Sequence, residues 1–207
     1  MIKRISDAEA IVGGLSKPSK MPGLAYGIPA KRCPIGSILR TVPGSVCNNC
    51  YALKGRYVFA NVQAAQERRF HTLKDPRWVD AMAFLILRKN CKWFRWHDSG
   101  DIQGLWHLEK ICEVAQRCPD TDFWLPTREH GVVKFFIASG GIVPPNLCIR
   151  VSATMVNGKL PDAANTSSVV SGTKFKVTCP AYKQGGKCGD CRACWNKDVA
   201  NVSYPEH

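Results

Sequence analysis

The sequence lacks any apolar run that approaches the roughly 18 consecutive residues of a membrane-spanning helix. Its first residues, Met-Ile-Lys-Arg-Ile-Ser-Asp, are charged and lead into no apolar stretch of signal-peptide length. Internal repeats and low-complexity segments are absent as well. These absences predict a cytoplasmic protein with no membrane partner, in a compartment where thiols stay reduced.

Acidic residues are scarce: 16 Asp and Glu stand against 29 Lys and Arg, which gives a formal net charge of +13. Such an excess favours contact with polyanions, above all nucleic acid. No Arg-rich run or basic arm concentrates the charge, so a merely basic, soluble surface is the alternative. The 207 residues suffice for one domain but fall short of a full eight-stranded β/α barrel, which takes about 250.

Cysteine is abundant, with 11 residues, an odd number that cannot pair completely as disulfides. In a reducing compartment, clustered cysteines more often bind metal or act in catalysis. Four of them lie apart from the clusters, within or beside apolar elements, and are expected to be buried structural residues. These four are Cys91, Cys112, Cys118 and Cys148.

The C-terminal cysteines are the stronger metal-binding signal. Cys179, Cys188, Cys191 and Cys194 follow a C-x8-C-x2-C-x2-C pattern in a glycine-containing segment that can wrap around one site. Two successive C-x2-C steps resemble the closely spaced ligands of ferredoxin clusters. A four-cysteine zinc site is the alternative.

The N-terminal cysteines are Cys33, Cys47 and Cys50, joined by a loop rich in glycine and proline. Three thiolates without an obvious fourth predict a cluster with one open iron, where a ligand or substrate can bind. A single C-x2-C pair could instead be a redox pair, so this group is the less specific of the two. Together the two groups predict one or two [4Fe-4S] clusters.

Strand-like and helix-like segments alternate along the chain, which predicts a largely parallel sheet. Residues 1–32 are expected to be extended, with one short strand. The expected helices cover 58–73, 76–89, 103–117 and 132–138, and the expected strands cover 24–28, 92–97, 122–125, 146–152 and 174–178, with 169–170 in a further one.

This pattern predicts an α/β fold: a partial, open parallel β/α barrel of five or six strands, with cysteine-rich loops at the C-terminal edge of the strands. The whole chain, 1–207, is expected to form a single domain. Its expected parts are an N-terminal extension with the three-cysteine loop (1–57), a β/α core (58–178) and the four-cysteine segment (179–207).

Polar residues follow the expected strands, where α/β folds bind their ligands. Asp98, Ser99, Gly100 and Asp101 could hold an amino group or ribose hydroxyls, and Ser152 ends a later strand. The alternative for the first four is an Asx-type turn that caps the following helix.

Other residues near the strands are less specific. His97 is expected to be a core residue with its hydrogen bonds satisfied, and a ligand or a catalytic base is the alternative. Arg128 and Arg150 could bind a carboxylate or phosphate, or pair with nearby acidic residues. The aromatic side chains of this region are expected in the core; they are Trp93, Phe94, Trp96, Trp106 and Trp124.

Three segments carry a family resemblance: Cys47-Asn-Asn-Cys50-Tyr51-Ala52, Trp96-His97-Asp98-Ser99-Gly100-Asp101 and Val151-Ser152-Ala153-Thr154. With the terminal Cys-Gly-Asp-Cys-Arg-Ala-Cys-Trp, they resemble a small bacteriophage family known as gene product eighty-eight, over residues 30 to 195. This resemblance implies the cytoplasm of the host cell.

The arrangement is also similar, more distantly, to radical S-adenosylmethionine enzymes, which are partial barrels with a three-cysteine cluster after the first strand. That resemblance implies that Cys33, Cys47 and Cys50 hold the open-iron cluster and that Ser99-Gly100-Asp101 contacts the methionine amino group. The four late cysteines would then hold an auxiliary cluster.

Three functions stay open from the sequence. The first is an enzyme that starts radical chemistry from S-adenosylmethionine on an unknown substrate. The second is a non-enzymatic, basic metalloprotein that binds host nucleic acid or a host protein such as polymerase, with metal as a structural staple. The third is simple electron transfer.

Overall fold

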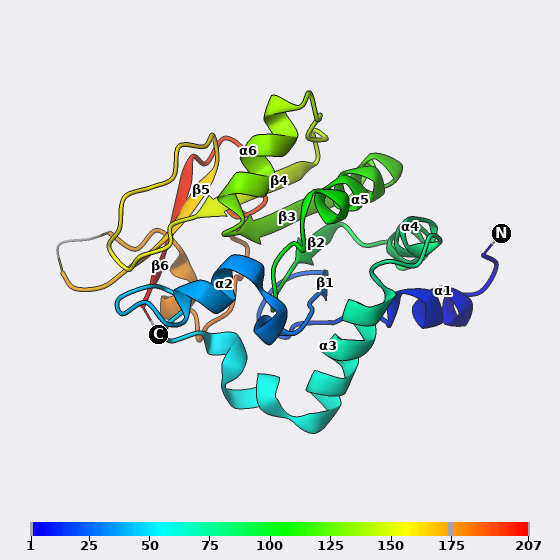
Figure 1. Cartoon of the computed structure of the whole chain (residues 1–207), viewed down its shortest axis with the longest axis horizontal. Coiled ribbons are helices and arrows are strands. Elements are labelled where there is room, and N and C mark those ends of the chain that lie inside the picture. The colour runs from blue at the N-terminus through cyan, green and yellow to red at the C-terminus, as the bar shows by residue number, and fades with distance from the viewer. Residues whose placement is uncertain (1, 174–175, 207) are drawn as a thin grey trace.

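The protein forms an open α/β structure around one sheet of six strands (Figure 1). The computed structural model describes residues 2–173 and 176–206. The strands lie in chain order, and all five neighbouring pairs are parallel, which confirms the predicted parallel sheet. The sheet is not closed: its edges are β1 and β6. The strands are β1 (Leu24–Tyr26), β2 (Trp93–Trp96), β3 (Asp122–Thr127), β4 (Leu147–Ser152), β5 (Thr166–Val170) and β6 (Asn201–Pro205).

Six α-helices and four 3-10 turns connect the strands in the described ranges. None of these helices is long and apolar enough to span a membrane. The helices are α1 (Ile5–Val12), α2 (Pro34–Leu39), α3 (Ala60–Thr72), α4 (Trp78–Arg88), α5 (Leu105–Arg117) and α6 (His130–Ala138), and the turns are η1 (Ala30–Arg32), η2 (Tyr51–Leu53), η3 (Gly55–Val58) and η4 (Pro180–Lys183).

Four predicted helices and most predicted strands are confirmed within a few residues, but two predictions fail and one strand was not predicted. The expectation that 1–32 is extended is wrong, because α1 lies there and buries Ala8 and Val12. The four-cysteine segment ends in the unpredicted strand β6. The strand predicted over 174–178 lies partly outside the described residues, and its described part, 176–178, is not a strand.

One face of the sheet packs against helices. Side chains alternate along a strand, so Phe94 and Trp96 of β2 point to the same face and are fully buried there. Phe123 and Leu125 of β3 join them in a core formed with α1, α4, α5 and α6. Phe94 and Trp96 are core residues, as the sequence predicts, whereas Trp93 and Trp106 are only partly buried.

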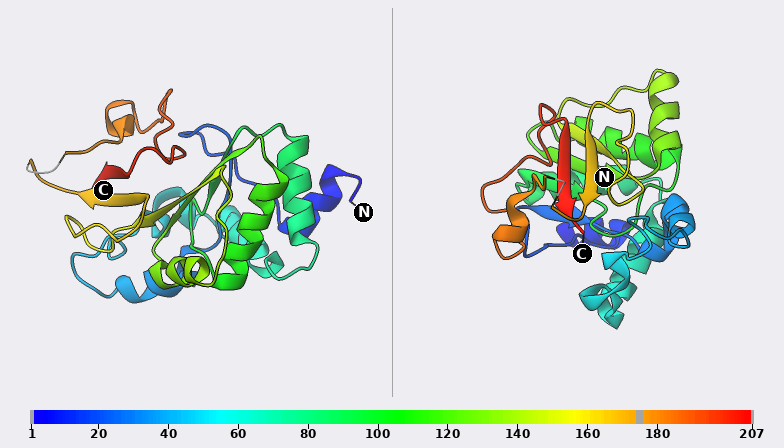
Figure 2. Two further views of the ribbon diagram at one scale, coloured as in Figure 1. Left: turned by 90° about the horizontal axis from the view of Figure 1, so that it is seen from above. Right: turned by 90° about the vertical axis from the view of Figure 1, so that its left-hand side faces the viewer.

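The opposite face is covered by the C-terminal segment between β5 and β6. Figure 2 shows this orange-to-red segment across the sheet from the green helices. Trp124 of β3 packs edge-on against Trp195, with ring centroids 5.2 Å apart. The Trp195 indole nitrogen also donates to the Phe94 carbonyl at 2.9 Å. The four-cysteine segment is therefore part of the packed fold.

Arg150 is fully buried in β4 and fastens this segment to the sheet. Its guanidinium donates to the carbonyls of Ala193, Cys194 and Asn196 at 2.7 to 3.0 Å, and to that of Thr166 at 3.2 Å. The prediction that Arg150 receives an anion or pairs with an acidic residue is therefore wrong. The physical reason is that four carbonyl oxygens already accept hydrogen bonds from the N–H groups of its guanidinium.

Candidate functional site

The loop with the first three cysteines lies across the carboxyl ends of several strands. The backbone nitrogen of Val46 donates to the carbonyl of Thr154, which follows β4, at 2.9 Å. The hydroxyl of Tyr51 donates to the carbonyl of Asp98, which follows β2, at 2.8 Å. The loop that follows β1 is therefore joined to the loops that follow β2 and β4.

The first three thiols share one neighbourhood. A Cβ at Gly36 would lie 3.5 Å from the Cys33 sulfur and 3.8 Å from the Cys47 sulfur, so both sulfurs flank this glycine. Burial raises the pKa of the Cys33 thiol, and the charge of Asp101 raises it further. Ionised Cys50 and Cys47 add to this rise, so all three thiols lie within electrostatic reach of one another.

The four late cysteines are also neighbours. Burial raises the pKa of Cys179 and of Cys188, and the charge of Cys191 raises both further. Cys194 is buried, its sulfur lies 3.2 Å from the Tyr204 hydroxyl, and burial raises its pKa to about 12. The raised pKa values keep the thiols of Cys179, Cys188 and Cys194 protonated at neutral pH, so metal binding would release their protons.

No disulfide joins any of the 11 cysteines, which are all free. Among the described residues, no group of three or more His, Cys, Asp or Glu side chains is arranged as ligands of a metal ion. The predicted clusters therefore still rest on cysteine spacing and proximity. The other four cysteines, Cys91, Cys112, Cys118 and Cys148, are buried, as predicted.

Asp101 has a structural role at the carboxyl-terminal edge of the sheet. One of its carboxylate oxygens accepts hydrogen bonds from the Thr127 hydroxyl at 2.6 Å and the Ile102 nitrogen at 2.8 Å, and the other accepts from the Arg128 nitrogen at 2.9 Å. Asp101 thus fixes the loop after β3 to the loop after β2. No side chain of this turn caps the following helix, so the capping alternative is wrong.

Asp98 and Ser99 are different because each carries one buried side-chain oxygen without a hydrogen-bond partner among the described residues. Neither the Asp98 Oδ1 atom nor the Ser99 hydroxyl has a hydrogen-bond partner in the described structure. The Ser99 carbonyl accepts from the Ile28 nitrogen at 2.9 Å, which fixes the turn beside β1. Gly100, at φ +83°, lies so close to Ile28 that a Cβ would be 2.3 Å from its side chain. The turn therefore holds two unsatisfied polar groups on a fixed backbone.

Ser152 is buried and already partnered. Its hydroxyl lies 2.9 Å from the hydroxyl of Ser167, and its carbonyl lies 2.8 Å from Nε2 of His130. These bonds join β4 to β5 and to α6. The structure thus places Ser152 at the same sheet edge as Asp98, with its hydroxyl engaged by a neighbouring strand.

Arg95 belongs to this region but was not anticipated from the sequence. It lies in β2, and its Nη2 donates to the Tyr51 hydroxyl at 3.1 Å. The sequence feature that could have identified Arg95 is the alternation of side chains along β2. Phe94 and Trp96 face the core, so Arg95 must face the opposite side of the sheet.

His97 contradicts the expectation of a satisfied core histidine. It is buried at the end of β2 with φ +55°, and neither ring nitrogen has a hydrogen-bond partner in the described structure. Its ring packs edge-on against His107 of α5, with centroids 5.3 Å apart. Burial, aided by the charge of Arg95, lowers the pKa of His97 to about 3. Burial also lowers the pKa of His107.

We expect His97→Asn to weaken the acid sensitivity of folding. The unfolded chain protonates His97 near pH 6.5 but the folded chain does so only near pH 3, so falling pH favours unfolding. The loss attributable to His97 is about 2 kcal/mol between pH 7 and pH 5. Urea unfolding at both pH values measures it, with the exposed His71→Asn as control. Equal pH dependence in both variants would contradict the assignment.

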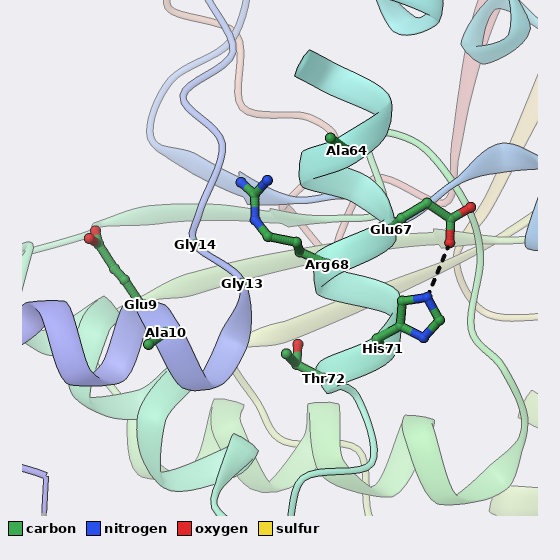
Figure 3. Close-up of a pocket in the computed structure, with 9 residues that line it drawn as sticks. All are labelled: Glu9, Ala10, Gly13, Gly14, Ala64, Glu67, Arg68, His71 and Thr72. Atoms are coloured by element: carbon green, nitrogen blue, oxygen red, sulfur yellow. Dashed lines mark ion pairs between the residues drawn. The ribbon is translucent and has the colours of Figure 1, made fainter. Parts of the chain in front are cut away.

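A separate cleft of about 610 Å³ lies between α1 and α3 (Figure 3). Its walls carry mixed charges, and the imidazole of His71 lies 3.8 Å from the carboxylate of Glu67. None of the residues predicted to bind metal or cofactor lines it. The lining residues are Glu9, Ala10, Gly13, Gly14, Ala64, Glu67, Arg68, His71 and Thr72.

Fold and site together define a class: an open, parallel β/α protein with a cysteine-containing loop after its first strand and a second cysteine group before its last. Within that class, the chain belongs to the family described as Gene product 88, whose model matches residues 3–197. The family resemblance is thus confirmed, and both cysteine groups lie in the matched range. No curated protein and no solved structure matches the chain. The likeness to radical S-adenosylmethionine enzymes stays a prediction.

Proposed function

We propose that the protein is an iron–sulfur protein in which Cys33, Cys47 and Cys50 hold a [4Fe-4S] cluster with one open iron. The mutual proximity of the three thiols supports this ligand set. Three thiolates leave one iron of such a cluster free to bind a ligand. The ligand would lie beside the turn that follows β2.

The observation that carries this proposal is the pair of unpartnered polar groups on Asp98 and Ser99. Buried polar groups are nearly always hydrogen-bonded, so two orphans in one turn favour a ligand that completes them. The turn is joined to the cysteine loop through Tyr51. A ligand bound at the open iron could therefore also reach this turn.

Cys179, Cys188, Cys191 and Cys194 are proposed to hold a second [4Fe-4S] cluster. Their two C-x2-C steps and their mutual proximity support this assignment over free surface thiols. Iron is favoured over zinc by the spacing, since zinc sites usually pair two C-x2-C turns across a longer gap.

For the ligand, we propose S-adenosylmethionine, with radical chemistry on an unidentified substrate. Its amino group and ribose hydroxyls are donors that suit the Asp98 carboxylate. A reduced cluster supplies the electron that such chemistry needs. Asp101 would act indirectly, by holding the loops after β2 and β3 in register.

Iron, sulfide and zinc content, measured with an absorption spectrum on protein purified without oxygen, tests the proposal. We expect about eight irons and eight sulfides per chain from two [4Fe-4S] clusters. Addition of S-adenosylmethionine and a reductant should then yield 5′-deoxyadenosine. One or two zincs without sulfide would overturn the iron–sulfur proposal. Intact clusters that yield no 5′-deoxyadenosine would overturn the proposal that S-adenosylmethionine is the ligand.

We expect Gly27→Ala to weaken binding of S-adenosylmethionine about tenfold while iron content stays unchanged. A Cβ at Gly27 would lie 2.1 Å from Asp98 Oδ1, so the carboxylate must move. Anaerobic calorimetry measures the affinity. Gly131→Ala is the matched control, because a Cβ there meets no atom within 4 Å. Equal affinities in the two variants would count against Asp98 as a ligand-binding group.

The second candidate is a non-enzymatic metalloprotein that binds nucleic acid, favoured by the net charge of +13. Residues 10–66, which include the three-cysteine loop, contain no Asp or Glu but several Lys and Arg. Phosphate contacts release counterions, so affinity should fall steeply with salt. Binding of labelled DNA and RNA across a salt series tests it, and no binding at low salt would exclude it.

A further inference from the structure

Residues 51–63 expose apolar and basic side chains side by side. The segment contains η2, η3 and the first turn of α3, and Figure 1 and the right-hand view of Figure 2 show it in cyan at the lower edge of the molecule, away from the sheet. Tyr51, Val58 and Phe59 are 43%, 48% and 56% exposed. Lys54 and Arg56, which lie between them in the chain, are exposed as well. The segment therefore presents large apolar side chains and two cations to the solvent.

Two tyrosines fix this segment beside the candidate site. The hydroxyls of Tyr51 and Tyr57 both donate to the carbonyl of Asp98, at 2.8 and 3.2 Å. Their rings pack edge-on, with centroids 5.7 Å apart. Tyr51 also directly follows Cys50 in the chain. The segment is thus joined both to the 98–101 turn and to the three-cysteine loop, so a molecule that binds it lies near the candidate site.

The charge of this surface is of one sign. No ion pair in the described part of the chain involves Lys54 or Arg56, and the sequence has no Asp or Glu from residue 10 to residue 66. The turn η1, which contacts η2, adds the exposed Lys31. Cations that no nearby carboxylate neutralises attract a polyanion.

A single-stranded nucleic acid matches both features of the segment. Its phosphates pair with cations, and its unpaired bases stack on accessible aromatic side chains such as Phe59. A protein partner would need acidic and apolar side chains in the same alternation, whereas a single strand carries one phosphate for every base. The exposed apolar side chains of α6 lack this match, because Phe135 and Ile137 share their helix with a single lysine, Lys134.

We propose that residues 51–63 are a docking surface for single-stranded nucleic acid, and that the bound strand places a nucleotide beside the open iron as the substrate. Because the segment is joined to the Asp98 carbonyl, a strand along it passes beside the turn proposed to hold the ligand. The docking surface needs no cluster, but the role of the strand as substrate rests on the proposed function.

Binding of labelled oligothymidylate and oligouridylate to the full chain, purified without oxygen, tests the surface. Fluorescence anisotropy measures the affinity across a salt series. The variants are Phe59→Ala and the double change of Lys54→Ala with Arg56→Ala. The matched controls are Phe135→Ala and Lys134→Ala on α6, where Phe135 is 59% exposed. All five side chains are exposed, so their loss costs little stability.

We expect Phe59→Ala to weaken binding about tenfold without changing its salt dependence, because a base loses the ring on which it stacks. The double change should lower the slope of log affinity against log salt by about 1.4, since each phosphate contact contributes about 0.7. The two α6 changes should alter neither quantity. Equal losses in the two sets of variants would overturn the docking surface and leave the iron–sulfur proposal intact. No binding at low salt would do the same and leave a protein as the partner of this surface.

A photoreactive strand tests whether the bound nucleic acid reaches the iron site. Oligothymidylate that carries 4-thiothymidine is irradiated with the protein, and the crosslinked residues are identified by mass spectrometry. We expect crosslinks in residues 47–59 and in the 98–101 turn. Crosslinks confined to other surfaces would overturn the role of the strand as substrate. The expected binding and crosslinks on a chain that holds zinc without sulfide would overturn the proposed function and uphold the docking surface.

Discussion

Replacement of Cys47 by alanine is expected to remove about half of the iron and sulfide from protein purified without oxygen. Cys47 is 7% exposed and shares the surroundings of Gly36 with Cys33. Two remaining thiolates hold an iron–sulfur cluster poorly, so the early cluster should be lost while the late one persists. Metal analysis and the visible absorption spectrum measure the loss.

Cys112→Ala is the matched control for this experiment. Cys112 is 4% exposed, so the change removes a comparably buried thiol, but it lies on the core face of α5, far in the chain from both cysteine groups. We expect full iron content, with a modest loss of stability from the small cavity. Equal iron in the Cys47 and Cys112 variants would contradict the early site.

Replacement of Arg150 by methionine is expected to lower the free energy of unfolding by about 3 to 5 kcal/mol. The change leaves four buried carbonyls without their shared donor. Three of these carbonyls belong to the four-cysteine segment, so this segment should separate from the sheet first. Urea unfolding measures the free energy, and hydrogen exchange over residues 193–196 measures the local opening.

Arg117→Met is the control for the arginine change. Arg117 is exposed and pairs with Asp80 and Glu113 on the surface, where ion pairs contribute less than about 1 kcal/mol. We expect a small change in stability and unaltered exchange at 193–196. If the two variants lose the same stability and exchange alike at 193–196, Arg150 does not hold the four-cysteine segment on the sheet.

The sequence predicts most of the core because its helices and strands carry strong periodic signals. In α5, Leu108, Ile111 and Ala115 recur at helical spacing and are all buried. The short helix α1 has no such support: no side chain caps it, and its burial depends on packing against α4, distant in sequence. Strand β6 ends in Pro205, which argues against a strand but is tolerated at the edge of a sheet.

The sequence predicts which loops form the candidate site, but it does not predict which side chains there are hydrogen-bonded. The topology alone places the 98–101 turn beside the three-cysteine loop. Only the structure distinguishes Asp98, whose Oδ1 atom is buried without a hydrogen-bond partner among the described residues, from Asp101, which accepts three hydrogen bonds. The prediction of an anionic partner for Arg150 failed for the same reason. Its hydrogen-bond partners are backbone carbonyl oxygens, which no sequence pattern identifies.

The position of Ser203 bears on how the protein behaves in a concentrated solution. Strand β6 is an edge of the sheet, and its outer side is bonded by the start of the four-cysteine segment, where the Cys179 nitrogen donates to the Ser203 carbonyl at 3.0 Å. The Ser203 nitrogen in turn donates to the Thr178 hydroxyl at 2.9 Å. Exposed edge strands recruit strands from other molecules. When the segment unfolds, the same backbone groups become free to pair with a second chain, so we expect unfolding of this segment to favour aggregation.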